Sequence, residues 1–362
     1  MRGALATGAL GLALVLLGVA VDAEPLLVPG VTLVAVTTAA AGWVAAAARG
    51  ARVERELSTH RVMEEQPLSV RITARAGTLP FPGGALEDSL LPEPAPLPAG
   101  RAVARVRIDV RFARRGARVL AAPALVLRDP LGVASRVVAE DGEERVLVLP
   151  RLYPVTASGE GSPLQSGGSA APVAGADIEL DGLRPYREGA PASRIHWAAL
   201  ARGAGLLERR LRPEGEGRPL VVLDTAGPAD ADDLDAAVRA AASLAHALAR
   251  GGGCSILLPS DRRATALEAD GRGWPAVHAR LAAVGPGRAA PALGAAAAGA
   301  HAIYYVAARR GARAPHRLRR GHGPQRVVLV VPGRLAGRRA AFSVAGCSGY
   351  VLVSGARAAV SA

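Results

Sequence analysis

Two long uncharged segments at the N-terminus constrain the chain most. Ala4–Val21 and Leu26–Ala48 contain no charged residue, and they are separated by the short segment Asp22–Pro25. Each segment is long enough to cross a hydrocarbon core of about 30 Å as a helix. Half of all residues are hydrophobic and the mean hydropathy is +0.22, which is high for a water-soluble protein. The sequence therefore predicts a transmembrane helical hairpin within residues 1–50.

The charges that flank these segments predict their orientation. Arg2 precedes the first segment, and Arg49, Arg52 and Arg55 follow the second, whereas the connector carries Asp22 and Glu24. The positive-inside rule then places both ends of the hairpin, and the rest of the chain, in the cytoplasm. A cleaved signal peptide that ends near Ala23 is the alternative, and it would leave one span.

Composition excludes several classes of function. The formal net charge is +13, but all 44 basic residues are Arg and none is Lys, in a chain rich in Ala and Gly. We interpret this as the codon bias of a GC-rich genome and do not expect nucleic-acid binding. The two cysteines, Cys254 and Cys347, are far apart and lack the spacing of metal ligands, which excludes a zinc finger or a disulfide framework.

The part of the chain after the apolar segments divides into two regions with different hydrophobic periods. Residues 51–156 alternate apolar and polar side chains between Pro- and Gly-rich turns, which is typical of an antiparallel β-sandwich. The strands expected there are Leu68–Ala74, Ala102–Phe112, Val119–Leu127 and Arg145–Leu149. Residues 157–181 are rich in Gly, Ser and Pro and are expected to form a flexible linker or loop.

Residues 182–362 predict an α/β domain, because short apolar strands alternate with helical segments and such a pattern favours a parallel sheet. The expected strands are Pro219–Leu223, Cys254–Leu258, Ala302–Ala307 and Arg326–Val331, and the expected helices are Asp233–Arg250 and Trp274–Val284. The fold class is therefore α+β multidomain: a membrane hairpin, a β-sandwich and a Rossmann-like α/β domain.

Two motifs resemble a known bacterial family. RDPLGV (Arg128–Val133), followed by VLVLPRLYPV (Val146–Val155), resembles elements of the membrane-associated family called domain of unknown function 58. The stretch GLRPYREGAPASRIHWAALAR (Gly182–Arg202) resembles the core motif of that family. The positions that match and that could bind a partner are Tyr186, Gly189, Arg194, His196, Trp197 and Arg202.

The resemblance implies a von Willebrand factor A-like α/β domain and function within a complex. Members of this family look like partners of MoxR-type AAA+ ATPases and of transglutaminase-like membrane proteins, so the resemblance implies such partners for this chain. The motif also departs from the family pattern, because Ala190 stands where the family has Asp. We expect a structural joint or a partner-docking surface here rather than a catalytic site, since Glu188 and His196 have no evident nucleophile beside them.

Asp224 is the second candidate, because it ends an apolar strand where open α/β sheets place their ligand sites. In A-type adhesion domains, the equivalent strand leads into Asp-x-Ser-x-Ser, whose oxygens hold a divalent cation. This chain has Asp224 and Thr225, but Ala226 and Pro228 take the serine positions. Hard cations need several oxygen ligands, so the sequence predicts a degenerate site, no metal and no cofactor. The acidic residues Asp230, Asp232, Asp233 and Asp235 are interpreted as caps of the helix that follows.

These observations predict a membrane-anchored scaffold or interaction protein of the cell membrane, without enzymatic activity. Its expected partners are a MoxR-type AAA+ ATPase, a transglutaminase-like membrane protein and the lipid bilayer, and not nucleic acid. Two alternatives stay open. One is a divalent-cation-dependent ligand-binding A-type domain that uses Asp224. The other is a hydrolase or transferase centred on Glu188 and His196.

Overall fold

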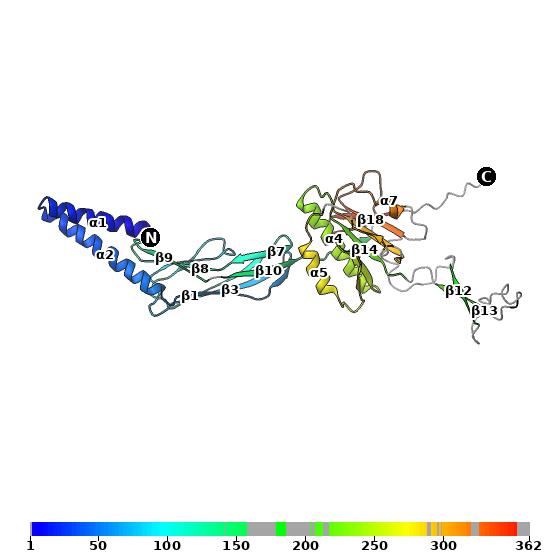
Figure 1. Ribbon diagram of the computed structural model, residues 1–362, viewed down its shortest axis with the longest axis horizontal. Helices are drawn as coiled ribbons and strands as arrows, with labels where there is room; N and C mark the ends of the chain where they lie inside the picture. The colour runs from blue at the N-terminus through cyan, green and yellow to red at the C-terminus, as the bar shows by residue number, and fades with distance from the viewer. Residues whose placement is uncertain are drawn as a thin grey trace. The chain divides into compact units, whose positions relative to one another are not determined.

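Figure 1 shows the computed structural model of the chain, a mixed α/β structure with apolar N-terminal helices and several sheets. The structure describes residues 2–140, 142–157, 179–185, 203, 207–212, 217–287, 291–294, 297, 299–319 and 326–352. The chain divides into two compact units, Met1–Val148 and Leu149–Ala362, and each is described by itself.

The first unit begins with two helices that pack against each other, α1 (Arg2–Ala20) and α2 (Glu24–Ala48). Their backbones approach closely at Gly30, where an added Cβ would lie 2.8 Å from Val15 Cγ2 and 2.9 Å from Val15 N. Such small residues allow tight contact between apolar helices. By length and composition α2 could cross a membrane, whereas the apolar part of α1, Ala4–Ala20, is shorter.

The last turns of α2 belong to the core of the β-rich part of this unit. Ala40, Val44 and Ala47 are buried, and they pack in one apolar cluster with strand residues such as Val53 and Leu127. The C-terminal end of α2 is therefore fixed to the sheets by burial of apolar side chains, the main favourable term in folding.

Ten short strands form three sheets in the first unit. They are β1 (Arg52–Leu57), β2 (Arg61–Met63), β3 (Pro67–Arg75), β4 (Gly84–Glu87), β5 (Ala95–Leu97), β6 (Val103–Arg111), β7 (Gly116–Ala121), β8 (Ala124–Arg128), β9 (Ser135–Ala139) and β10 (Glu143–Leu149). The sheets have the orders β1-β3-β6, β2-β10-β7 and β5-β4-β8-β9. Successive residues of β6 are alternately exposed and half-buried, as the alternation of polar and apolar residues in its sequence predicts.

One expected strand, Val119–Leu127, is wrong, because the structure divides it into β7 and β8 in two different sheets. Pro123 lies at the break. Proline has no N–H to donate to a sheet, so a continuous central strand through this position is disfavoured.

Arg55 on β1 holds the sheets together through its buried guanidinium. Its Nε donates to Glu144 on β10 at 2.7 Å, and its Nη1 donates to Asp88 at 2.9 Å and to the carbonyl oxygen of Ala121 at 2.9 Å. The side chain of Asp88 is fully buried and that of Arg55 is 3% exposed. Because both charges are paired and hydrogen-bonded, their burial is tolerated.

The second unit contains an eight-stranded sheet of order β11-β19-β20-β18-β17-β14-β15-β16. Its strands are β11 (Thr156–Ala157), β14 (Leu220–Asp224), β15 (Cys254–Leu257), β16 (Thr265–Leu267), β17 (Ala302–Ala307), β18 (Arg326–Pro332), β19 (Phe342–Val344) and β20 (Cys347–Leu352). The four central strands β15, β14, β17 and β18 are parallel, and the outer ones run antiparallel to their neighbours.

Alternate residues of the central strands face two separate apolar cores. One core contains Val221, Leu223 and Tyr304 together with helices α4 (Ala231–Arg250) and α5 (Trp274–Ala283). The other contains Leu220, Val222 and Tyr305 and is covered in part by the short helix α7 (His316–Arg319). The central parallel strands and their helices agree with the sequence prediction, because strands buried on both faces are continuously apolar.

The second unit begins earlier in the sequence than we expected. The carbonyl oxygen of Pro150 lies 2.8 Å from His278 Nε2, the N–H of Tyr153 donates to Ser243 Oγ at 2.9 Å, and β11 pairs with β19. Residues 150–157 therefore pack with the α/β core, whereas the sequence assigned residues up to 156 to the β-sandwich and residue 157 to the linker. β12 (Glu179–Pro185) covers the end of the expected linker and the start of the family motif, and it pairs with β13 (Leu207–Arg212), which follows the motif, in a two-stranded antiparallel sheet.

Candidate functional site at the carboxyl edge of the α/β sheet

The carboxyl ends of the parallel strands form the candidate site, and β14 is its centre. From β14 the chain passes through α4 to β15 on one side, and it returns through β16 and α5 to β17 on the other side. Counted from β14, the strand order is therefore 3-2-1-4-5 across the central part of the sheet. Such a reversal of strand order creates a crevice at the carboxyl edge, where doubly wound proteins bind ligands.

Asp224, the last residue of β14, has both carboxylate oxygens engaged. Oδ2 accepts a hydrogen bond of 2.5 Å from the hydroxyl of Tyr305 on β17, and Oδ1 accepts from the N–H of Ala226 at 3.0 Å. Burial, and then the hydrogen bond and the negative charge of Asp224, raise the pKa of Tyr305 far above its usual range. Tyr305 therefore stays protonated at physiological pH, and its hydroxyl donates a hydrogen bond to Asp224.

The side chains present do not fit a divalent cation at this position. Ala226 contributes a backbone N–H, which is a donor and points at the carboxylate. Thr225 is 1% exposed, and its hydroxyl has no hydrogen-bond partner among the described residues. Within the described ranges, no group of three or more His, Cys, Asp or Glu side chains could hold a metal ion. Both carboxylate oxygens of Asp224 already accept hydrogen bonds, and Ala226 and Pro228 supply no side-chain oxygen, so a hard cation would find too few oxygen ligands here.

At the start of α4 the structure shows the predicted capping role for Asp230, whereas Asp233 pairs with Arg310. Asp230 is the N-cap, and its side chain accepts from the N–H of Asp233 at 2.7 Å. The carboxylate of Asp233 is buried and accepts from Arg310 Nε at 2.8 Å. This hydrogen bond and the charge of Asp233 raise the pKa of Arg310 further. Arg310 follows β17, so this ion pair connects the ends of β17 and α4.

A pocket of about 450 Å³ opens beside Asp224, between the carboxyl ends of β14 and β15 and the end of α5. It is lined by Thr225, by the segment 258–260 and by the segment 283–287, with Arg280 at its rim. The guanidinium of Arg280 pairs with Asp261 at 2.5 Å and its side chain is 46% exposed. The pocket thus combines apolar walls with one accessible cationic group.

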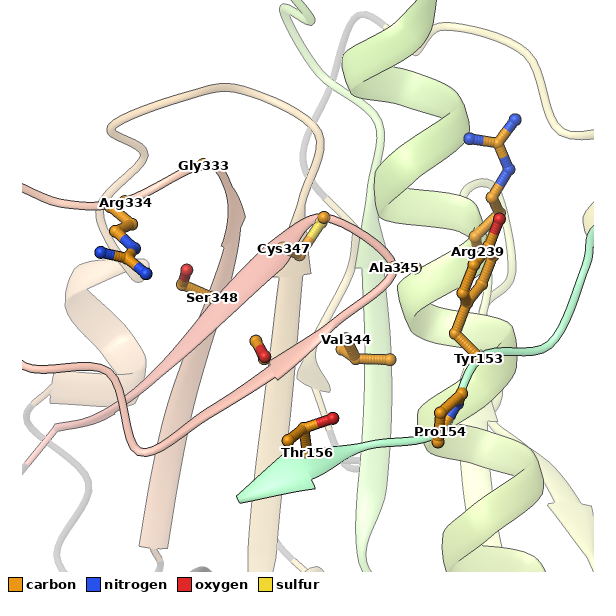
Figure 2. Close-up of a pocket in the computed structure, with 12 residues that line it drawn as sticks. Tyr153, Pro154, Thr156, Arg239, Gly333, Arg334, Val344, Ala345, Cys347 and Ser348 are labelled. Carbon is orange, nitrogen blue, oxygen red and sulfur yellow. The ribbon is translucent and has the colours of Figure 1, made fainter. Parts of the chain in front are cut away.

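A second pocket, of about 590 Å³, lies near the other end of the same edge (Figure 2). It is bounded by the β19–β20 hairpin, by the segment that leads into β11 and by α4. Arg239 of α4 and Arg334, which follows β18, stand on either side of the hairpin. Because β18 is parallel to β14, Arg334 belongs to the same carboxyl edge as Asp224.

The predicted site residues fall into two groups. Tyr186, Glu188, Gly189, Arg194, His196, Trp197 and Arg202 lie outside the described residues, so the structure does not test them. Asp224 and Thr225 lie at the expected strand end. Sequence reasoning missed Tyr305 and Arg310, which contact Asp224 and Asp233. The sequence did contain a clue to Tyr305, because a tyrosine in an otherwise apolar buried strand needs a hydrogen-bond partner for its hydroxyl.

A scan against family models and a search of curated proteins each gave no match for this chain.

Proposed function

We propose that this protein is a membrane-anchored interaction protein whose α/β unit docks protein partners along the carboxyl edge of its sheet. The observation that carries the proposal is the state of Asp224. Its carboxylate lies at the switch point of the sheet, yet Tyr305 and Ala226 already satisfy it. An edge with this topology and without an oxygen set for a cation favours binding of another molecule by shape and charge.

The charges along this edge favour an acidic partner surface. Arg280, Arg309, Arg310 and Arg334 all follow or flank the carboxyl ends of the central strands and are exposed, and two of them, Arg280 and Arg310, also pair with Asp261 and Asp233. Arginine is enriched in protein interfaces, and two pockets at this edge offer apolar walls next to arginines. Acidic side chains beside an apolar anchor would complement this surface.

The membrane part of the proposal rests on α1 and α2. Two apolar helices packed as a pair support a transmembrane hairpin with the rest of the chain in the cytoplasm, in agreement with the flanking arginines. The resemblance to the domain of unknown function 58 family supports a von Willebrand factor A-like identity for the α/β unit. It also supports a MoxR-type AAA+ ATPase or a transglutaminase-like membrane protein as the partner.

Site-specific photo-cross-linking in native membranes tests the docking edge. A photo-reactive amino acid replaces Arg334, which follows β18, and in a matched control it replaces Arg326, the exposed first residue of the same strand. We expect position 334 to capture an AAA+ ATPase, identified by mass spectrometry, and position 326 to capture none. Equal capture at both ends of β18, or no protein captured at position 334, would overturn the proposed docking edge.

A further inference from the structure

The end of the β-rich part next to α2 is a distinct surface formed by four loops. The loops are residues 49–51, 76–83, 98–102 and 129–134. Gly77 lies so close to the first loop that an added Cβ would overlap the carbonyl oxygen of Arg49. The N–H of Phe81 donates to the carbonyl oxygen of Arg101 at 2.9 Å, and the N–H of Arg128 donates to that of Gly83 at 3.1 Å. The four loops therefore meet at one end of the sheets, which we call the basal surface.

Apolar side chains project from this surface. Leu131 is 70% exposed at the tip of the loop 129–134, and Leu79 is 37% exposed in the loop 76–83. The conformation of the Leu131 loop is fixed from inside, because the buried carboxylate of Asp129 accepts from the N–H groups of Leu131 and Ala134. The Asp-Pro-Leu-Gly motif thus forms a rigid turn that holds a leucine in solvent.

The same surface carries a concentration of positive charge. Five arginines in or beside the four loops are exposed: Arg49, Arg52, Arg75, Arg101 and Arg128. None of the five forms an ion pair with a residue that the structure describes, and the one carboxylate in these loops, Asp129, is buried. Arg52 and Arg75 are direct cross-strand partners, an arrangement of like charges that destabilises a sheet. An anionic surface would relieve this repulsion.

The length of α2 brings the basal surface close to the bilayer. Ala40, Val44 and Ala47 are buried against the sheets, so residues 24–39, one side of which packs on α1, are the part of α2 that can lie in lipid. At 1.5 Å per residue this part is about 24 Å long, which is shorter than a hydrocarbon core of about 30 Å. Trp43 lies beyond this part and is 43% exposed, and tryptophans are enriched at the headgroup level of membranes. The sheets must therefore approach the headgroups.

We propose that the basal surface is a lipid-contacting face, which binds anionic headgroups through its arginines and inserts Leu131 and Leu79 among them. This inference rests on the proposed membrane insertion of α1 and α2. Each arginine close to an anionic leaflet contributes about fivefold to the affinity for it. The leucines and Trp43 add apolar contact at the level where the helices enter the lipid.

A fluorescent label on an introduced cysteine tests the contact in the full-length protein. Leu131→Cys carries an environment-sensitive dye, and Thr59→Cys, in the exposed turn after β1 at its other end, is the control. The native thiols do not compete, because Cys254 and Cys347 are buried and burial raises the pKa of each to about 12. The labelled proteins are reconstituted in phosphatidylcholine vesicles with and without about 30% phosphatidylglycerol, near the charge of an anionic leaflet.

We expect a blue-shifted emission at position 131, quenched by headgroup spin-labelled lipid in the anionic vesicles, and an aqueous emission at position 59. Arg128→Gln should lower about fivefold the ratio of dye with blue-shifted emission to dye with aqueous emission at position 131. Arg107→Gln, which replaces an exposed arginine inside β6, should leave this ratio unchanged. An aqueous emission at position 131 in a protein that resists alkaline extraction would overturn the lipid contact and leave the membrane anchor intact. A protein that alkaline extraction releases would overturn both.

Discussion

The hydrogen bond between Tyr305 and Asp224 gives the sharpest test of how the candidate site is held together. Tyr305→Phe removes the hydroxyl that donates to Asp224 Oδ2 at 2.5 Å and leaves a ring of nearly the same volume in a site that is 2% exposed. Hydrogen bonds to charged groups contribute about 1.5–3 kcal/mol. Asp224 is half-buried, so water can replace part of the lost contact. We therefore expect a loss near the lower end, about 1.5 kcal/mol.

Hydrogen exchange followed by mass spectrometry measures this loss locally, in peptides from β14 and β17 of the full-length protein. A loss of about 1.5 kcal/mol raises exchange through the opened state about tenfold. A double-mutant cycle with Asp224→Ala isolates the pair, and we expect a coupling free energy of about 1–2 kcal/mol. A coupling below about 0.3 kcal/mol would show that the two side chains contribute independently, and it would refute the assignment of Asp224 as a structural acceptor.

Three further outcomes follow from the second unit. Burial lowers the pKa of His278 below its usual value of 6.5, so its contribution to stability is present above that pH and is lost as the pH falls. The midpoint of urea unfolding should drop between pH 7.5 and 5.5, and less so in His278→Gln. Gly349→Ala would overlap the ring of Phe342 and should cost about 1–3 kcal/mol in thermal unfolding, whereas Gly285→Ala, with open space around it, should cost far less. Millimolar Mg²⁺ should give no binding heat in calorimetry, and a saturable heat abolished by Asp224→Ala would contradict the account of the site.

The central strands could be predicted from sequence because they are apolar on both faces. β14, β15, β17 and β18 begin and end within about one residue of the expected segments. The hairpin β19–β20 was missed. Both residues of its turn, Ala345 and Gly346, have positive φ. Turns of this kind are usually recognised from an Asn-Gly or Asp-Gly pair, and Ala-Gly does not give that signal. Local sequence therefore predicted the buried centre of the sheet better than its edge.

The site was predictable only in part, because it is formed by contacts between distant segments. Asp224 could be placed at a strand end from the sequence alone, but its partner Tyr305 is 81 residues away. Tyr304 and Tyr305 are adjacent and equally buried, and only the register of β14 with β17 decides which of them faces Asp224. Register depends on pairing across the sheet, and hydrophobic periodicity does not specify it.

The role of Asp224 as an acceptor changes how an acidic residue at this position should be interpreted. In an A-type domain, an aspartate at the end of the first strand invites a metal assignment. Here the aspartate joins the ends of β14 and β17 through Tyr305 and fixes the following turn through Ala226. Loss of function in Asp224→Ala would therefore not by itself indicate a cation. Asp224→Asn removes the charge but keeps one acceptor oxygen, which can accept from Tyr305 while the NH2 group then faces the N–H of Ala226. Its neutral side chain is a weaker ligand for a hard cation than a carboxylate. Retained partner capture in Asp224→Asn, with loss in Asp224→Ala, would identify the hydrogen bond as the function of this side chain.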